Sequence, residues 1–419
     1  MPQRSHRFAL MGSRPAAGLV GLALVLVAGS GTLRAASPAA AAAGSLVPVS
    51  SFGANPGALA MYTYTPANLP ARAPLVVALH GCTQTANDYF THSGWAELAD
   101  RYGFAVVFPQ QSTANNNQRC FNWYTPAEDG RGVGEAASIK SMVDFAKGQR
   151  DLDATRVYVT GLSAGGGMTA NLLADYPDVF AGGATNSGLP AQCATNLSQA
   201  TSCQHNNQNL TPAQWAAKVT GSFPGYSGPF PRVAIWQGTA DTTVVPVNGT
   251  ELRDQWTAVH GLSQVPSSTT TLPAGTTKTT YDNAAGTPMV ARFSIAGMGH
   301  GTAVRAGTAT ENCGSTGAYF LNYLCSSFYT AQFWGLTGPA ATPAPTASPA
   351  PAPSPTATAA PVCFTASNYA QTVAGRAYQS GGNTFANGSN QAMGLWNTFV
   401  THTLRQTGPN FWVLADGQC

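Results

Sequence analysis

The sequence predicts an α/β protein with a parallel central sheet and a small additional module at its C-terminal end. Short apolar segments, such as the continuous Leu75–Leu79 and the apolar centre of Arg232–Gln237, are typical of buried strands. Segments with helical spacing separate these strands, which favours parallel pairing with helices on both faces of the sheet. Residues 339–361 contain only proline, alanine, threonine and serine. We expect them to form an extended linker to a compact module at 362–419.

The composition narrows the class of protein. The chain has 419 residues, which is enough for a large core and one or two further modules. Only 9% of the residues are charged and the net charge is +3, so we expect no nucleic-acid partner. No group of histidine, cysteine and carboxylate residues has the spacing of a metal site, and neither a metal nor a cofactor is expected.

Residues 1–43 resemble a secretory signal. Three arginines precede an apolar segment at Leu19–Ala28, and small residues follow at Ala41 and Ala43. The apolar segment is too short to make a stable membrane anchor, although an uncleaved anchor is the alternative. We therefore expect a secreted, extracellular protein whose eight cysteines form disulfides in an oxidising compartment.

The strands expected within residues 44–338 are short and mostly apolar. After a weakly alternating segment at residues 57–66, they comprise Leu75–Leu79, Phe104–Phe108, Arg156–Thr160, Arg232–Gln237 and Ala291–Ala296. A small, glycine-rich segment at Phe180–Asn186 lies between the third and fourth of these.

Helical spacing accounts for most of the intervening sequence. The expected helices cover residues 86–101, 135–150, 168–173, 249–260 and 319–334. Residues 109–120 are polar and rich in asparagine, and they predict a loop. The long polar insertion at Gly188–Ser227 is expected to form a cap over the functional site.

The segment Gly161-Leu162-Ser163-Ala164-Gly165 joins an apolar strand to a helix. This is the G-x-S-x-G pattern of a nucleophile elbow in its strand–turn–helix context, and it makes Ser163 the candidate nucleophile of an α/β-hydrolase fold. Gly161 and Gly165 remove side chains that would clash with the strand or the helix. An ordinary glycine-rich turn is the alternative interpretation.

A serine nucleophile needs a base and an orienting carboxylate, which follow it in the chain order Ser, Asp, His. Asp241 comes just after the strand at 232–237, and His300 lies between glycines just after the strand at 291–296. We therefore assign Asp241 as the acid and His300 as the base. The alternative acids Glu251 and Asp254 lie in a helical segment and are expected to be solvated.

An oxyanion hole in this fold uses the N–H group after the nucleophile and another from an early strand-to-helix loop. The first is Ala164, and Cys82 in the segment His80-Gly81-Cys82 is the best candidate for the second. The side chain of His80 either orients this loop or is an ordinary buried histidine.

Four segments together resemble one family. They are Leu79–Gln84, Gly161–Gly166, Gly238–Asp241 and Gly297–His300. The family comprises extracellular poly(3-hydroxybutyrate) depolymerases and the related feruloyl and acetylxylan esterases. The order of the segments resembles the type 1 depolymerase catalytic domain, and the resemblance covers most of residues 47–336.

The module at 362–419 resembles the short substrate-binding domain of such depolymerases, in segments such as Cys363–Tyr369 and Ala374–Tyr378. The resemblance implies a serine esterase that acts on insoluble polyester. We also expect a monomer with no membrane partner. It also implies that Trp123 lines the substrate crevice, although a tryptophan in the core is the alternative. His80 is grouped with Trp123 as a candidate substrate contact.

The eight cysteines are expected to pair locally. The predicted disulfides are Cys82–Cys120, Cys193–Cys203, Cys313–Cys325 and Cys363–Cys419. This is one of 105 possible connectivities, and we favour it because each pair lies within one loop region or one module.

Two further functional interpretations compete with a polyester depolymerase. The same catalytic residues in a feruloyl or acetylxylan esterase would act on plant polysaccharide, with the C-terminal aromatic residues binding carbohydrate. A non-enzymatic adhesin with a decayed hydrolase domain is disfavoured because Ser163, Asp241 and His300 are all present.

Overall fold

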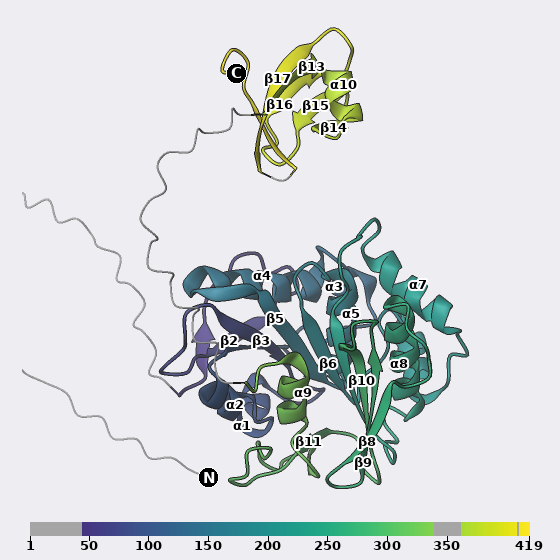
Figure 1. The fold of residues 1–419 in the computed structure, drawn as a ribbon. Coiled ribbons are helices and arrows are strands. Elements are labelled where there is room, and N and C mark those ends of the chain that lie inside the picture. Colours follow the sequence, from purple (N-terminus) through teal and green to yellow (C-terminus); the bar gives the residue numbers. More distant parts are fainter. Residues whose placement is uncertain (1–43, 339–361, 409) are drawn as a thin grey trace, which may run out of the picture. The chain divides into compact units, whose positions relative to one another are not determined.

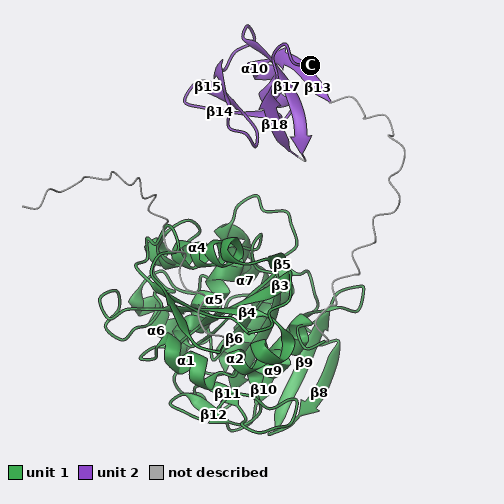
Figure 2. Cartoon of the chain, turned by 90° about the vertical axis from the view of Figure 1, so that its left-hand side faces the viewer, with its two compact units in different colours: residues 1–341 green, residues 342–419 purple. Residues whose placement is uncertain are grey.

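A computed structural model describes residues 44–338, 362–408 and 410–419. The expected signal at 1–43 and the expected linker at 339–361 lie outside the described residues. The chain divides into two compact units, residues 1–341 and 342–419 (Figure 2). The first unit contains Ser163, Asp241 and His300, and each unit is described by itself.

A ten-stranded sheet forms the centre of the first unit (Figure 1). Its strands, in spatial order, are β1 (Val47–Val49), β2 (Ala60–Tyr64), β4 (Ala105–Gln110), β3 (Ala73–Leu79), β5 (Leu152–Leu162), β6 (Gly182–Asn186), β7 (Arg232–Gly238), β10 (Pro288–Ile295), β9 (Thr276–Asp282) and β8 (Ser268–Leu272). The six strands from β4 to β10 pair in parallel. The pairs at both edges are antiparallel, so the sheet is mixed rather than wholly parallel.

Helices cover both faces of this sheet. One face packs against α4 (Gly134–Gln149), α5 (Ala164–Asp175) and α8 (Val247–Val259), and the other against α1 (Ala86–His92), α2 (Trp95–Tyr102) and α9 (Ser326–Trp334). In β3 the buried side chains point alternately to the two faces: Val77 packs with the core residues on the face of α4, α5 and α8, and Val76 with those on the face of α1, α2 and α9. Both faces are therefore apolar, which explains why the central strands read as continuous apolar segments.

Two expected helices differ in the structure. The helix expected at 86–101 is divided into α1 and α2 at Gly94, which has φ 82°. A Cβ atom there would lie 2.6 Å from Sγ of Cys313, so this close approach requires glycine. The helix expected at 319–334 begins only at Ser326, because β12 (Phe320–Asn322) pairs with β11 (Thr302–Val304).

The hairpin β8–β9 was not expected from the sequence. Its strands are rich in threonine, and four of the five residues of β8 are exposed. The search for apolar segments missed them for that reason. They extend the sheet beyond β10 on the antiparallel edge.

The polar insertion at 188–227 contains α6 (Leu197–His205) and α7 (Pro212–Ser222), while the short α3 (Pro126–Asp129) lies before α4. Helix α7 packs against α8 and α5. Gln255 of α8 bonds to both the N–H and the C=O of Ala191 (2.8 and 2.9 Å). The end of α6 meets the loop after Asp241, because Val245 N–H donates to the carbonyl of Gln204 (2.9 Å). The insertion thus packs along α5 and α8 and borders the site at one end.

The second unit is small and rich in strands. One sheet has the order β13 (Cys363–Ser367), β17 (Thr401–Gly408) and β18 (Phe411–Leu414), and the other β14 (Ala377–Ser380), β15 (Asn383–Ala386) and β16 (Ala392–Leu395). Helix α10 (Asn368–Val373) is joined to β16 by the buried Asn368 amide, which donates to Met393 O and Leu395 O. The core comprises Ala377, Ala386, Met393, Leu404 and Trp412. Trp412 therefore packs inside the module.

Candidate active site

Ser163 lies on the turn between β5 and α5. Its backbone has φ 56° and ψ −118°, an uncommon conformation for a residue with a side chain. Its N–H donates to the carbonyl of Asn186 at the end of β6 (2.9 Å). The Ser163 hydroxyl forms no hydrogen bond with any described residue, His300 included.

The glycines around Ser163 permit two close backbone approaches. A Cβ atom on Gly161 would lie 2.2 Å from the carbonyl oxygen of Gly165. A Cβ atom on Gly165 would lie 2.4 Å from the carbonyl oxygen of His80. The steric role predicted for Gly161 and Gly165 is confirmed. The second approach also brings the start of α5 against the loop that follows β3.

Ser163, Asp241 and His300 follow β5, β7 and β10, whose carboxyl ends meet at one edge of the sheet. Leu162 pairs with Asn186, Asn186 with Trp236 and Trp236 with Phe293. The three residues therefore follow strands that end at the same edge of the sheet. Parallel pairing therefore brings together residues that are far apart in the sequence.

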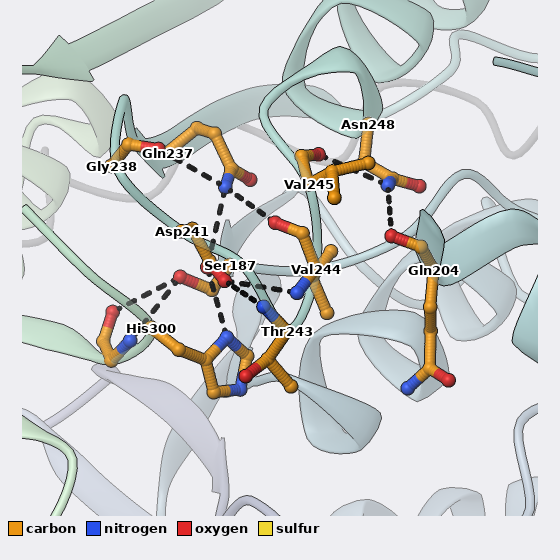
Figure 3. A network of polar contacts seen from close by, with 11 residues as sticks. Ser187, Gln204, Gln237, Gly238, Asp241, Thr243, Val244, Val245, Asn248 and His300 are labelled. Carbon is orange, nitrogen blue, oxygen red and sulfur yellow. Dashed lines mark hydrogen bonds and ion pairs between the residues drawn. The ribbon is translucent and has the colours of Figure 1, made fainter. Parts of the chain in front are cut away.

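Asp241 and His300 are joined directly, because His300 Nδ1 lies 2.9 Å from Asp241 Oδ2 (Figure 3). Oδ1 of Asp241 accepts the N–H groups of Thr243 and Val244, both at 2.9 Å. Gln237 Nε2 adds a longer bond to Oδ2 (3.3 Å). The carboxylate is thereby fixed on both of its oxygens.

The electrostatics of this pair favour an ionised acid. Asp241 is 2% exposed, and burial by itself would raise its pKa. The hydrogen bond and charge of His300, together with the Val244 N–H, outweigh burial and leave the pKa of Asp241 below its ordinary value. An ionised Asp241 holds the Nδ1 proton of His300 and leaves Nε2 as the basic nitrogen.

The two proposed oxyanion donors lie on neighbouring backbones. The Cys82 amide donates no hydrogen bond to any described residue. Ala164 is the first residue of α5, and the N–H groups of a first helical turn have no partner within the helix. Because Gly165 packs against the carbonyl of His80, these two amides lie on facing segments beside Ser163.

The structure places His80 inside the protein, which corrects its grouping as a substrate contact. His80 is fully buried, and burial lowers its pKa to about 4, so its ring is neutral. Nδ1 bonds to the carbonyl of Gly81 (2.7 Å), and Nε2 accepts from the N–H of Gln111 (3.1 Å). A ring with both nitrogens occupied orients the loop before Cys82 instead of binding substrate.

Trp123 also lies in the core, contrary to the expectation that it lines the crevice. It is 2% exposed, and a Cβ atom on Gly167 would lie 2.8 Å from its ring. Its carbonyl accepts from Asn171 Nδ2 (2.7 Å). The ring is thus packed against α5 and supports the helix that carries Ser163.

Sequence reasoning missed Glu135 as a residue that organises the loop beside Cys82. Glu135 is fully buried, and its carboxylate accepts from Gln111 Nε2, from Asn122 N (2.8 Å) and from Asn122 Nδ2 (2.6 Å). A glutamate at the start of a helical segment gives no signal of this role.

The structure pairs the same cysteines that the sequence analysis pairs. The disulfides are Cys82–Cys120, Cys193–Cys203, Cys313–Cys325 and Cys363–Cys419. The first joins the loop of Cys82 to the loop held by Glu135. The last connects the first residue of β13 to the last residue of the sequence.

Comparison with known proteins identifies the family. The model of the family described as "Esterase PHB depolymerase" matches residues 58–281, which span β7, Ser163 and Asp241. Poly(3-hydroxyalkanoate) depolymerase C of Paucimonas lemoignei is 49% identical over 294 residues, which cover 70% of this chain and 70% of that protein. The chain belongs to the esterase PHB depolymerase family.

Other relatives of this chain are named feruloyl esterases and acetylxylan esterases. Feruloyl esterase B of Talaromyces stipitatus is 37% identical over 265 residues, covering 62% of this chain and 72% of that protein. The solved acetyl xylan esterase from Aspergillus awamori superposes with a TM-score of 0.60 and 28% identity, covering 70% of this chain and all of that one. The α/β-hydrolase fold predicted from the sequence is confirmed.

Proposed function

We propose that this protein is a secreted serine esterase that hydrolyses the ester bonds of poly(3-hydroxybutyrate) or similar short-chain polyhydroxyalkanoates. As a member of its family, the chain is a carboxylic ester hydrolase. The observation that carries the proposal is the Asp241–His300 hydrogen bond (2.9 Å) at the sheet edge that also holds Ser163. Nucleophile, base and acid occur in the order that an α/β-hydrolase requires.

In the proposed mechanism, the Ser163 hydroxyl attacks the ester carbonyl while His300 Nε2 takes its proton. Asp241 keeps the imidazole in the required tautomer and stabilises the imidazolium. His300 then protonates the leaving alkoxide, and an acyl group remains on Ser163. Water, deprotonated by His300, repeats the attack and releases the acid. The contact between Ser163 and His300 is expected to form when substrate binds, since contacts between a nucleophile and its base often tighten only then.

The Cys82 and Ala164 amides are proposed to bind the oxyanion of both tetrahedral intermediates. Loss of one such donor typically costs about 2.7–4 kcal/mol of barrier. The buried ring of His80 orients the Cys82 loop, and Glu135 holds the neighbouring loop that contains Cys120. The first disulfide fixes it at Cys82 itself.

The polyester substrate is supported by the 49% identical depolymerase and by the character of the second unit. We propose that residues 362–419 bind the polymer. Phe399 is 90% exposed, and Leu395 and Trp396 are 61% and 43% exposed. Trp396 stands beside Tyr369 of α10, with ring centroids 5.4 Å apart. Such a surface suits adsorption to an apolar solid. The expected linker at 339–361 would then hold the catalytic unit near the adsorbed module.

Feruloyl or acetylxylan esters are the alternative substrates, because named esterases of both kinds align with this chain. In the described residues, we find no helix long and apolar enough to cross a membrane. The four disulfides are compatible with secretion, which we propose on the basis of the expected signal at 1–43. A monomeric state remains our prediction.

The proposal is tested by the clearing of poly(3-hydroxybutyrate) granules, followed as turbidity, beside the hydrolysis of a feruloyl ester and of acetylated xylan. We expect clearing by the wild-type protein and none by Ser163→Ala at equal concentration. Rapid hydrolysis of the feruloyl or acetyl ester without clearing would favour the alternative. Failure of an active-site serine probe to label Ser163 would contradict both.

A further inference from the structure

Tyr319 stands beside the proposed catalytic base. The centroids of the Tyr319 and His300 rings are 6.0 Å apart, with the rings at 78° to one another. Tyr319 is 44% exposed. Within residues 44–338, three other large apolar side chains are comparably exposed, namely Val133, Leu197 and Val265. Of these four residues, Tyr319 alone is aromatic, and its ring lies beside His300, the proposed base.

The backbone holds this ring outside the core. Tyr319 has φ 66°, which is a strained conformation for a bulky residue. The next residue, Phe320, is 2% exposed and packs between the rings of Tyr89 and His92. The turn therefore places Phe320 in the core and leaves the Tyr319 ring at the surface beside His300.

The loop that carries Tyr319 is bound to the segment that follows His300. The carbonyl of Tyr319 accepts from Thr302 N–H (2.8 Å). A Cβ atom on Gly301 would lie 2.6 Å from the same carbonyl oxygen. Backbone contacts thus fix the positions of Tyr319 and His300 relative to each other, in addition to the packing of their side chains.

The same loop is bound to the proposed oxyanion segment. Gln84 is 4% exposed; its Oε1 accepts from Gly81 N–H (2.8 Å) and its Nε2 donates to the carbonyl of Ala318 (3.0 Å). One buried amide thereby spans the residues beside Cys82 and the residue before Tyr319. The loop that carries Tyr319 is therefore fixed to the segment of Cys82 as well as to the segment that follows His300.

We infer that Tyr319 is a specificity-determining residue whose ring forms the wall of the subsite for the alcohol portion of the ester. This inference rests on the proposed function. His300 must hand its proton to the leaving alkoxide oxygen, so the group next to His300 is the alcohol side of the ester. In a polyester, that group is the next hydroxyacyl unit, whose methyl and methylene groups pack favourably on an aromatic face.

The test compares two soluble esters with the same butyryl group and different alcohols. Methyl butyrate has a one-carbon alcohol, whereas methyl 3-(butyryloxy)butyrate has a hydroxybutyrate unit; butyrate release is measured for both. We expect Tyr319→Ala to lower kcat/KM for the second ester roughly tenfold, mainly through KM, and for the first by less than about twofold. Tyr319→Phe should retain wild-type values, as should the surface control Val265→Ala.

The strained backbone supplies a second readout. Tyr319→Gly and Tyr319→Ala should lose the same discrimination between the two esters, but the glycine variant should have the higher melting temperature because φ 66° suits glycine. Equal losses on both esters, or no loss on either, would overturn the inference. Failure of the proposed function has a different signature, since the wild-type protein would then release no butyrate from the ester of the hydroxybutyrate unit.

Discussion

His300 Nδ1 lies 2.9 Å from Asp241 Oδ2, although the two residues are 59 positions apart in the sequence. The second carboxylate oxygen of Asp241 is occupied by two backbone N–H groups. An asparagine at 241 would keep its oxygen toward those N–H groups and turn its NH₂ group toward His300. The imidazole would then carry its proton on Nε2 and fail as a base.

Asp241→Asn is therefore expected to lower kcat on a soluble p-nitrophenyl ester by about ten-thousandfold, with little change in the far-UV circular dichroism. Ser163→Ala and His300→Ala should be comparably inactive. Asp254→Asn is the control, because Asp254 pairs with Arg253. A second histidine, His260, follows Asp241 in the chain at the end of α8. Near-wild-type rates for His300→Ala, together with an inactive His260→Ala, would make His260 the base.

The disulfide at Cys82 is expected to act on catalysis as well as on stability. The double variant Cys82→Ser, Cys120→Ser frees the loop whose amide is proposed to bind the oxyanion. We expect kcat to fall by roughly tenfold, which is less than the loss of a whole donor, with KM nearly unchanged. Steady-state kinetics on a soluble ester measures both.

The matched control is Cys193→Ser, Cys203→Ser, which removes the disulfide of the insertion. It should lower the melting temperature while kcat stays near the wild-type value. The expectation for the first pair fails if the two double variants lose kcat to the same extent.

Stability should depend on pH through Glu251. Glu251 was expected to be solvated but is 3% exposed. Burial raises its pKa from 4.5 to about 7, against the hydrogen bond from Gln208 N–H and with a contribution from Asp254. The folded state thus keeps a proton that the unfolded chain loses, and the unfolding free energy falls as pH rises from 4.5 to about 7.

Glu251→Gln removes this titration and retains an oxygen for Gln208 N–H. Relative to wild type, it should become more stable on going from about pH 4 to about pH 8, by on the order of 3 kcal/mol. Urea unfolding of both proteins at the two pH values measures the change. A stability difference that is the same at both pH values would show that the pKa of Glu251 is the same in the folded and unfolded states.

The second unit should matter for solid substrate only. Phe399→Ala changes a side chain that is 90% exposed, so it should leave the fold and the hydrolysis of soluble esters intact. Erosion of poly(3-hydroxybutyrate) film should be slowed, because a surface-bound enzyme acts at a higher effective concentration. A chain ending at Gly338 should show the larger effect.

Moderate salt should change granule binding little, since the proposed contact is apolar rather than ionic. Film weight loss at low enzyme concentration is the measurement, with p-nitrophenyl butyrate hydrolysis as the internal reference. If the truncated chain erodes film as fast as the full chain, residues 362–419 serve folding or secretion rather than binding.

The sequence alone determined the features that depend on local chemistry. The apolar segments and helical spacing predicted the central strands and most helices, and Gly161 and Gly165 predicted the turn at Ser163. Chain order also singled out Asp241 and His300 after their strands, and the same loops contained the cysteines that the structure pairs. These features are local because the spacing of apolar residues and the conformation of a turn each depend on a few neighbouring residues.

The tertiary structure decided how segments far apart in the sequence approach one another. It buried His80 and Trp123, formed the antiparallel edges of the sheet, and turned Tyr319 toward His300. A histidine, a tryptophan or a threonine-rich strand has the same local pattern whether it faces solvent or another segment. Only the packing of the whole chain selects between these environments, because burial depends on which distant surfaces meet.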